Sequence, residues 1–225
     1  KIKSATYFSK MTGNFPMDTL EFRTSYYFKK EFINPADTFI GAAFAWFNNE
    51  DTSKMHLCYD GNAKISFYDD TKDISIDSFK TSSLPFRPVP EPFFQRARSL
   101  INYALNTHDT IVTDVVDFGD SIKLSLFVPG KVVYFFGRPY APDIPYVSQD
   151  EKYSKFEMWI SKSDDLPYKI KSKYFFGSDI ETYNNVEYNK IKLKDFVPAR
   201  YFPPDYKILE TGKNQVKTND LTGKK

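Results

Sequence analysis

Cysteine and histidine are nearly absent from this chain, which has one Cys and two His in 225 residues. Cys58 alone cannot form an internal disulfide, and no C-x-x-C motif is present for redox or zinc chemistry. His56 and Cys58 are two residues apart in a predicted strand, so we expect both side chains on one face. Two ligands are too few for a zinc site, and parallel neighbours do not converge as nucleophile and base. We therefore predict no metal and no cofactor.

Long apolar runs and catalytic motifs are missing as well. The longest charge-free apolar stretch, Thr38–Phe47, is too short to cross a bilayer. No P-loop, dinucleotide-binding fingerprint or G-x-S-x-G motif occurs. The carboxylate pairs Asp69–Asp70 and Asp164–Asp165 lie in predicted turns, where Asp caps its own backbone. A hydrolase or other enzyme is disfavoured, and we expect this chain to be non-catalytic.

Neither sign of charge dominates, because 31 basic and 29 acidic residues give a net charge of +2. No cluster of Lys and Arg marks a nucleic-acid partner. Lys169, Lys171 and Lys173 alternate with other residues, which is typical of a solvated strand face. The chain begins at Lys1 without Met, so we expect that a targeting segment ahead of it has been removed.

Aromatic residues are abundant, with 22 Phe and 16 Tyr, and they favour sheet over helix. Alternation of apolar and polar residues predicts about ten strands, and Asp-Gly at Asp60–Gly61 predicts a hairpin turn. Val128–Lys131 reads as a type II turn that joins two strands. The predicted strands are Ile2–Lys10, Leu20–Phe28, Ile40–Trp46, Lys54–Tyr59, Lys64–Tyr68, Ile74–Phe79, Ile122–Val128, Lys131–Gly137, Lys155–Ser161, Tyr168–Phe176 and Thr182–Lys192.

Only one segment has clear helical periodicity. Apolar residues recur at helical spacing within Glu91–Asn106, and Pro92 suits the first turn of such a helix. A single sheet of so many strands must curl or split. The sequence therefore predicts a mainly β fold: a curved antiparallel sheet that forms an incomplete, half β-barrel, with the helix as a lid. Residues 1–210 are expected to form this domain, and residues 211–225 a polar linker.

An aromatic and apolar stripe is the feature with most functional weight. Its members would face inward from the strands and the helix, either as a filled core or as the lining of an apolar pocket. The two interpretations remain open at the level of sequence. The candidate ligand-binding residues are Phe22, Tyr26, Phe44, Trp46, Phe93, Leu100, Ile101, Phe156, Met158, Tyr174 and Phe176.

Three stretches resemble the LolA/LolB family of lipoprotein carriers. They are LCYDGNAKISFYDDTKDISIDSF at 57–79, MWISKSDDLPYKIKSKYFFG at 158–177 and LKDFVPARYFPPDYKILE at 193–210. The resemblance implies a half-barrel with a helical lid over an apolar cavity, located in the periplasm, and it is compatible with a lipid anchor to a membrane. It implies a hydrophobic ligand: a lipid, an acyl chain or a lipoprotein segment.

The last residues, NDLTGKK at 219–225, are similar to the opening of a TlpA-like thioredoxin domain. That similarity implies a thioredoxin-like domain after Lys225 and a parent protein that is a thiol-disulfide oxidoreductase. Two hypotheses follow for this chain. It is either a binding module for a hydrophobic ligand, or a docking module that positions the thioredoxin-like domain and has no ligand of its own.

Overall fold

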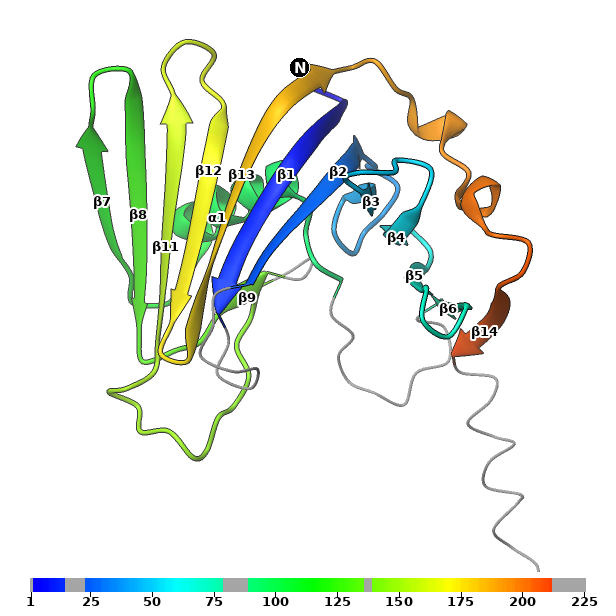
Figure 1. Ribbon diagram of the computed structural model, residues 1–225. Helices are drawn as coiled ribbons and strands as arrows, with labels where there is room; N and C mark the ends of the chain where they lie inside the picture. Colours follow the sequence, from blue (N-terminus) through cyan, green and yellow to red (C-terminus); the bar gives the residue numbers. More distant parts are fainter. Residues whose placement is uncertain (1, 15–22, 79–88, 136–138, 212–225) are drawn as a thin grey trace, which may run out of the picture. The chain divides into compact units, whose positions relative to one another are not determined.

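The computed structural model describes residues 2–14, 23–78, 89–135 and 139–211 (Figure 1). The chain is mainly β, with a large, curved antiparallel sheet that is not closed into a barrel, so the predicted fold class is confirmed. One α-helix, α1, spans Phe93–Asn106. The strands are β1 (Ser4–Asn14), β2 (Arg23–Ile33), β3 (Ala42–Asn48), β4 (Met55–Tyr59), β5 (Lys64–Tyr68), β6 (Asp73–Asp77), β7 (Val112–Asp117), β8 (Ser121–Pro129), β9 (Tyr134–Phe135), β10 (Pro139–Tyr140), β11 (Tyr153–Ser161), β12 (Pro167–Tyr174), β13 (Gly177–Tyr188) and β14 (Lys207–Thr211).

Most strands pair with their neighbours in sequence, as short turns require. The hydrogen-bonded order is β14-β6-β5-β4-β3-β2-β1-β13-β12-β11-β8-β7, with β9 and β10 as a separate pair. Strand β14 pairs with β6 in parallel. The alternation of apolar and polar residues did not predict β14. The contacts divide the chain into two compact units, to both of which β1 and β2 contribute residues.

The first unit comprises residues 1–6, 27–89 and 187–225. Its strand β3 is buried on both faces, as its uninterrupted apolar sequence predicts. Phe47, Cys58 and Ile65 belong to one core cluster, which the segment 193–206 covers with Phe196, Tyr201, Phe202 and Tyr206. The Phe47 and Tyr201 rings meet edge to face at 5.0 Å. This cluster is a filled core.

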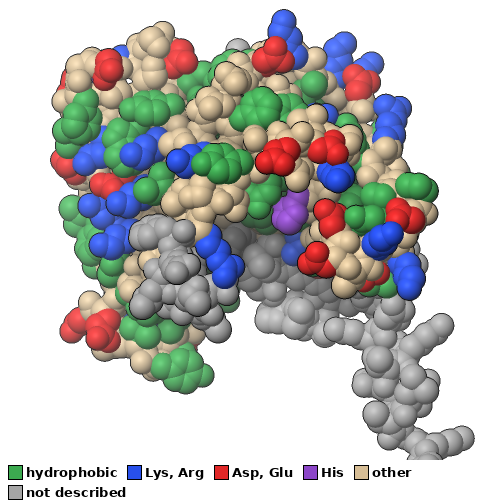
Figure 2. Space-filling view, in the orientation of Figure 1, with side chains coloured by type: hydrophobic (Ala, Val, Ile, Leu, Met, Phe, Trp, Pro, Cys, Tyr) green, Lys and Arg blue, Asp and Glu red, His purple; other side chains and the backbone are tan. Residues whose placement is uncertain are grey.

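The second unit comprises residues 7–26 and 90–186. Its strands β7, β8, β11, β12 and β13 are adjacent and antiparallel, and α1 lies against one face of them (Figure 1). On the opposite face Glu157 is within 4 Å of Lys123, Lys155 and Lys171. Figure 2 shows Lys and Arg side chains among apolar ones over β8, β11 and β12. The predicted solvated lysine face is confirmed.

The predicted hairpin between 122–128 and 131–137 is wrong. β8 pairs with β7 and β11, whereas the short strand β9 pairs with β10. Gly130 has φ of +71°, so it does turn the chain as a glycine can, but the chain leaves the sheet there. The error has a physical source: β7 is half polar and mostly exposed, so its sequence carries little strand signal.

Candidate functional site

An apolar pocket of about 180 Å³ lies in the second unit, between α1 and the strands β7, β8 and β11. The helix supplies one wall and the inward side chains of the three strands supply the other. Its polar groups are few, so it offers little to orient a polar ligand. The lining residues are Leu100, Ile101, Ala104, Leu105, Thr113, Asp114, Val115, Leu124, Ser125, Leu126, Phe156 and Met158.

The amphipathic sequence of α1 explains why the helix covers this face. Its buried positions Phe93, Ala97 and Leu100 recur at helical spacing and turn toward the sheet. Pro92 precedes the first helical residue, and its carbonyl accepts the hydrogen bond from the Arg96 backbone N–H at 2.8 Å. Toward its C-terminal end the helix exposes Leu105, which is 76% exposed although it also lines the pocket. The pocket is therefore open along this rim.

An ion-pair network holds α1 to β13. Arg96 donates from Nη1 to Asp179 at 3.0 Å and from Nη2 to Glu181 at 2.9 Å. Glu181 also accepts a hydrogen bond of 2.7 Å from the Ser9 hydroxyl. Burial raises the pKa of Asp179, and this effect outweighs the opposing effect of the Arg96 charge. The helix is thus fixed to the sheet by the ion pairs of Arg96 near its N-terminal end and by apolar contacts from Leu100 onward.

Aromatic side chains fill the space beside the pocket. The Phe156 ring meets Phe135 at 5.3 Å and Tyr174 at 6.1 Å, both edge to face. Tyr174 stacks on Phe176 with ring centroids 5.3 Å apart. The Tyr103 hydroxyl donates to Asp109 at 2.6 Å, and burial raises the pKa of Tyr103 to about 12. Mutual packing therefore limits the size of the pocket.

Four of the predicted ligand-binding residues line the pocket: Leu100, Ile101, Phe156 and Met158. The others lie elsewhere. Tyr174 and Phe176 belong to the aromatic cluster just described, and Phe93 packs against Tyr7, Phe94 and Tyr183. Phe44 and Trp46 lie in the first unit, with ring centroids 6.0 Å apart and the Lys29 ammonium over the Trp46 ring. Tyr26 is 53% exposed beside Lys10, and Phe22 lies outside the described residues.

Tyr26 is exposed because of the strand alternation next to it. Lys10 follows Ser9 in β1, and Ser9 bonds to Glu181 on the face that α1 covers. Successive side chains point to opposite faces, so Lys10 and the Tyr26 ring that it approaches lie on the other face. Tyr26 and the pocket are therefore on opposite sides of the strands of the second unit.

Sequence reasoning missed the other pocket residues, chiefly those of β7 and β8. The alternation in Leu124–Leu126 marked a strand but gave no reason to choose it over other strands. Val115 lies in a strand that was not predicted at all. Ala104 and Leu105 continue the helical stripe of Leu100 and Ile101 by one turn, which is the one signal that could have found them.

His56 and Cys58 do not share a face, contrary to the prediction. A bulge falls where Trp46 and Phe47 of β3 pair with Leu57 and Met55 of β4. The extra residue shifts the alternation, so His56 is exposed and stacks on Tyr27 at 5.5 Å, while Cys58 is buried in the core. Burial raises the pKa of the Cys58 thiol, and partial desolvation of the His56 ring, which stacks on Tyr27, lowers the pKa of His56. No group of three metal-ligating side chains occurs within the described ranges.

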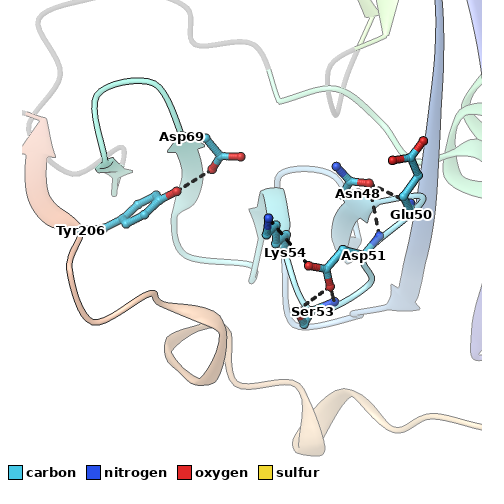
Figure 3. A network of polar contacts seen from close by, with 7 residues as sticks. All are labelled: Asn48, Glu50, Asp51, Ser53, Lys54, Asp69 and Tyr206. Carbon is cyan, nitrogen blue, oxygen red and sulfur yellow. Dashed lines mark hydrogen bonds and ion pairs between the residues drawn. The ribbon is translucent and has the colours of Figure 1, made fainter.

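Side-chain oxygens of Asn and Asp residues in the first unit accept hydrogen bonds in turns. Asn48 Oδ1 accepts from the backbone N–H of Glu50 at 2.8 Å, and Asp51 Oδ1 accepts from Ser53 at 2.6 Å (Figure 3). Asp69 accepts a hydrogen bond of 2.8 Å from the Tyr206 hydroxyl, which ties the β5–β6 turn to the covering segment (Figure 3). In the second unit Asp164 accepts from the Leu166 N–H at 3.1 Å. Both acidic pairs lie in turns, as predicted, but only Asp164 is seen to cap its own backbone, whereas the hydrogen bond to Asp69 comes from the Tyr206 side chain.

No model of a known protein family matches the chain, and no curated protein sequence is similar to it. Among solved structures it is similar to a Vibrio parahaemolyticus domain provisionally assigned to outer membrane lipoprotein sorting, with 10% identity and a TM-score of 0.41, covering 89% of this chain and 92% of that one. It is also similar to the lipoprotein LppX of Mycobacterium tuberculosis, with 13% identity and a TM-score of 0.41, covering 85% of this chain and 88% of that one. A LolA superfamily protein of Nitrosomonas europaea gives 11% identity, a TM-score of 0.33 and coverage of 88% and 91%.

Proposed function

We propose that this chain is a non-catalytic binding domain that holds the apolar part of a ligand in the pocket under α1. The observation that carries the proposal is the pocket itself, nine of whose twelve lining residues are apolar and which opens at Leu105 and Val115. Binding there depends on removal of apolar surface from water, which has no directional requirement. A lipid, an acyl chain or a lipidated segment fits this chemistry.

The volume limits what the pocket can enclose. Ligand pockets usually measure roughly 300–1,000 Å³, whereas this one measures about 180 Å³. An apolar cavity of about 150 Å³ holds one benzene molecule. The pocket therefore accommodates the end of an alkyl chain or one ring. About six buried methylenes contribute ~5 kcal/mol, which corresponds to a Kd of roughly 0.2 mM.

A pocket-filling substitution tests the proposal. Ala104→Phe places a ring in the pocket from the helix wall, so we expect a fluorescent fatty acid to lose its affinity for the variant. Asn102→Phe is the matched control, because it adds the same side chain to an exposed position of α1. Equal affinity of the probe for the wild type and Ala104→Phe would sink the proposal.

The periplasmic location and a thioredoxin-like domain after Lys225 are part of the same proposal. The residues on which the second depends, 219–225, lie outside the described part of the chain. No helix within the described ranges is long and apolar enough to cross a membrane. Reading the parent sequence beyond Lys225 tests for the thioredoxin-like domain, since a C-x-x-C motif there would support it and its absence would overturn it.

A further inference from the structure

Strand β7 is the last strand at one end of the hydrogen-bonded order. It pairs with β8 from Val112 to Asp117, and no described strand lies along its other side (Figure 1). Every second residue of an edge strand presents its N–H and C=O outward, ready to pair with another chain. The edge is six residues long, which is enough for several main-chain hydrogen bonds.

Several of the usual devices that protect an edge strand are missing from β7, although it carries two acidic residues, Asp114 and Asp117. The segment Val112–Asp117 contains no Pro and no Lys or Arg, and its register with β8 runs without a bulge. Val112 and Val115 are 58% and 64% exposed, so the strand presents apolar side chains to solvent. Such an edge favours addition of a further strand.

The open edge is continuous with the pocket. Val115 lines the pocket from β7, and Ile101 and Leu105 line it from α1, yet all three are among the exposed large apolar residues of the chain. An apolar side chain on a strand added to β7 would therefore meet Val115 and the pocket mouth. The volume of about 180 Å³ suits one such side chain.

The charge of β7 indicates what the added strand must carry. Asp117 is paired with Lys162 at 2.7 Å, whereas Asp114 has no ion-pair partner in the described part of the chain. Strand β8, on the paired side of β7, combines an apolar residue facing the pocket, Leu124, with a basic one on the other face, Lys123. A strand with the same alternation on the free side would place a cation beside Asp114 and an apolar group beside Val115.

We propose that the free edge of β7 binds an extended segment of a partner polypeptide in which apolar and basic side chains alternate. Main-chain hydrogen bonds to β7 supply the affinity, and the pocket mouth and Asp114 supply the specificity. The proposal goes beyond the binding of an alkyl chain, because it requires backbone groups that a fatty acid lacks.

The test measures fluorescence anisotropy of a capped, labelled heptapeptide of alternating Leu and Lys. We expect saturable binding, and loss of about 100-fold in affinity when three backbone nitrogens on one edge are methylated. Asp114→Lys should weaken binding about fivefold, and a peptide with Glu in place of Lys should restore it. Asp150→Lys is the control, since it makes the same charge change at an exposed loop position of the second unit.

Undiminished binding of the methylated peptide would overturn the proposal, as would an Asp114→Lys variant that binds like the wild type. Sedimentation of the chain alone would reveal a dimer if a second copy occupies the edge instead, and this also counts against it. The fatty-acid probe separates the two proposals. Its failure to bind removes the alkyl ligand only, while the methylation result decides the β7 edge.

Discussion

Arg96 is the residue on which the position of the helix depends most. It is 15% exposed and contacts two carboxylates, Asp179 and Glu181, which are 18% and 2% exposed. Two negative charges thus share one cation in a mostly apolar setting. Charges buried in this way are costly unless they are well paired. The raised pKa of Asp179 indicates that the Arg96 charge does not fully offset the burial of this carboxylate.

Asp179→Asn should stabilise the second unit at neutral pH. The folded-state pKa of Asp179 is raised, so its contribution to stability is complete below its unfolded pKa and is lost as the pH rises through the folded value. The amide keeps the shape but never ionises, and Glu181 still pairs with Arg96. We expect denaturant unfolding to show a higher free energy of unfolding for the variant than for the wild type at pH 7, and this difference should shrink toward about pH 4. A variant less stable than the wild type at pH 7 would show that the ion pair outweighs burial.

Arg96→Met should destabilise the second unit, because it leaves the two carboxylates without their cation. Removal of one partner from a buried ion pair costs at least about 3 kcal/mol of stability. We expect a value near this lower limit, because Arg96 and Asp179 are partly exposed. Arg98→Met, at an exposed position of the same helix, should cost much less. Equal losses measured by urea unfolding would mean that Arg96 contributes only its methylene packing.

At the scale of the elements, local sequence signals located most strands and the helix. The hairpin β4–β5 follows from Asp60–Gly61, where Asp60 accepts from the Asn62 N–H at 2.7 Å and Gly61 has φ of +97°. The helix α1 follows from its apolar periodicity. Three strands escaped prediction: the two-residue β10, and β7 and β14, which are short and largely exposed strands at the two ends of the order. Such strands are held by pairing more than by their own sequence, so periodicity cannot reveal them.

Gly61→Ala should destabilise the first unit through this hairpin. The positive φ is unfavourable for a residue with a Cβ by about 1–2 kcal/mol, and the new methyl group would also meet the Asn34 side chain. Gly119→Ala is an informative comparison, since its φ of +89° is similar but the space around it is open. Thermal unfolding should show a larger loss of stability for Gly61→Ala than for Gly119→Ala. The reverse order would mean that crowding by Asn34 contributes nothing.

At the scale of the whole molecule, most of the aromatic residues pack against one another. The predicted stripe was a mixture: part of it lies in the first unit, part fills an aromatic cluster in the second, and four members reach the pocket. Composition could predict an apolar interior, but it could not predict which aromatic residues form a filled core and which line a pocket. That depends on which strands pair and on where α1 is fixed. Of the two interpretations that the sequence left open, a filled core describes most of the stripe, whereas a pocket describes a local part of it that opens beside an unpaired strand edge.

The most direct test of the account is methyl NMR with a spin-labelled fatty acid. The Met158 methyl group lies in the pocket lining and the Met55 methyl group in the core cluster of the first unit, so the two serve as site and reference. We predict strong paramagnetic broadening of Met158, with Leu126 and Val115 beside it, and little effect on Met55. Broadening of Met55 with an unchanged Met158 signal, or no broadening of either, would contradict the account.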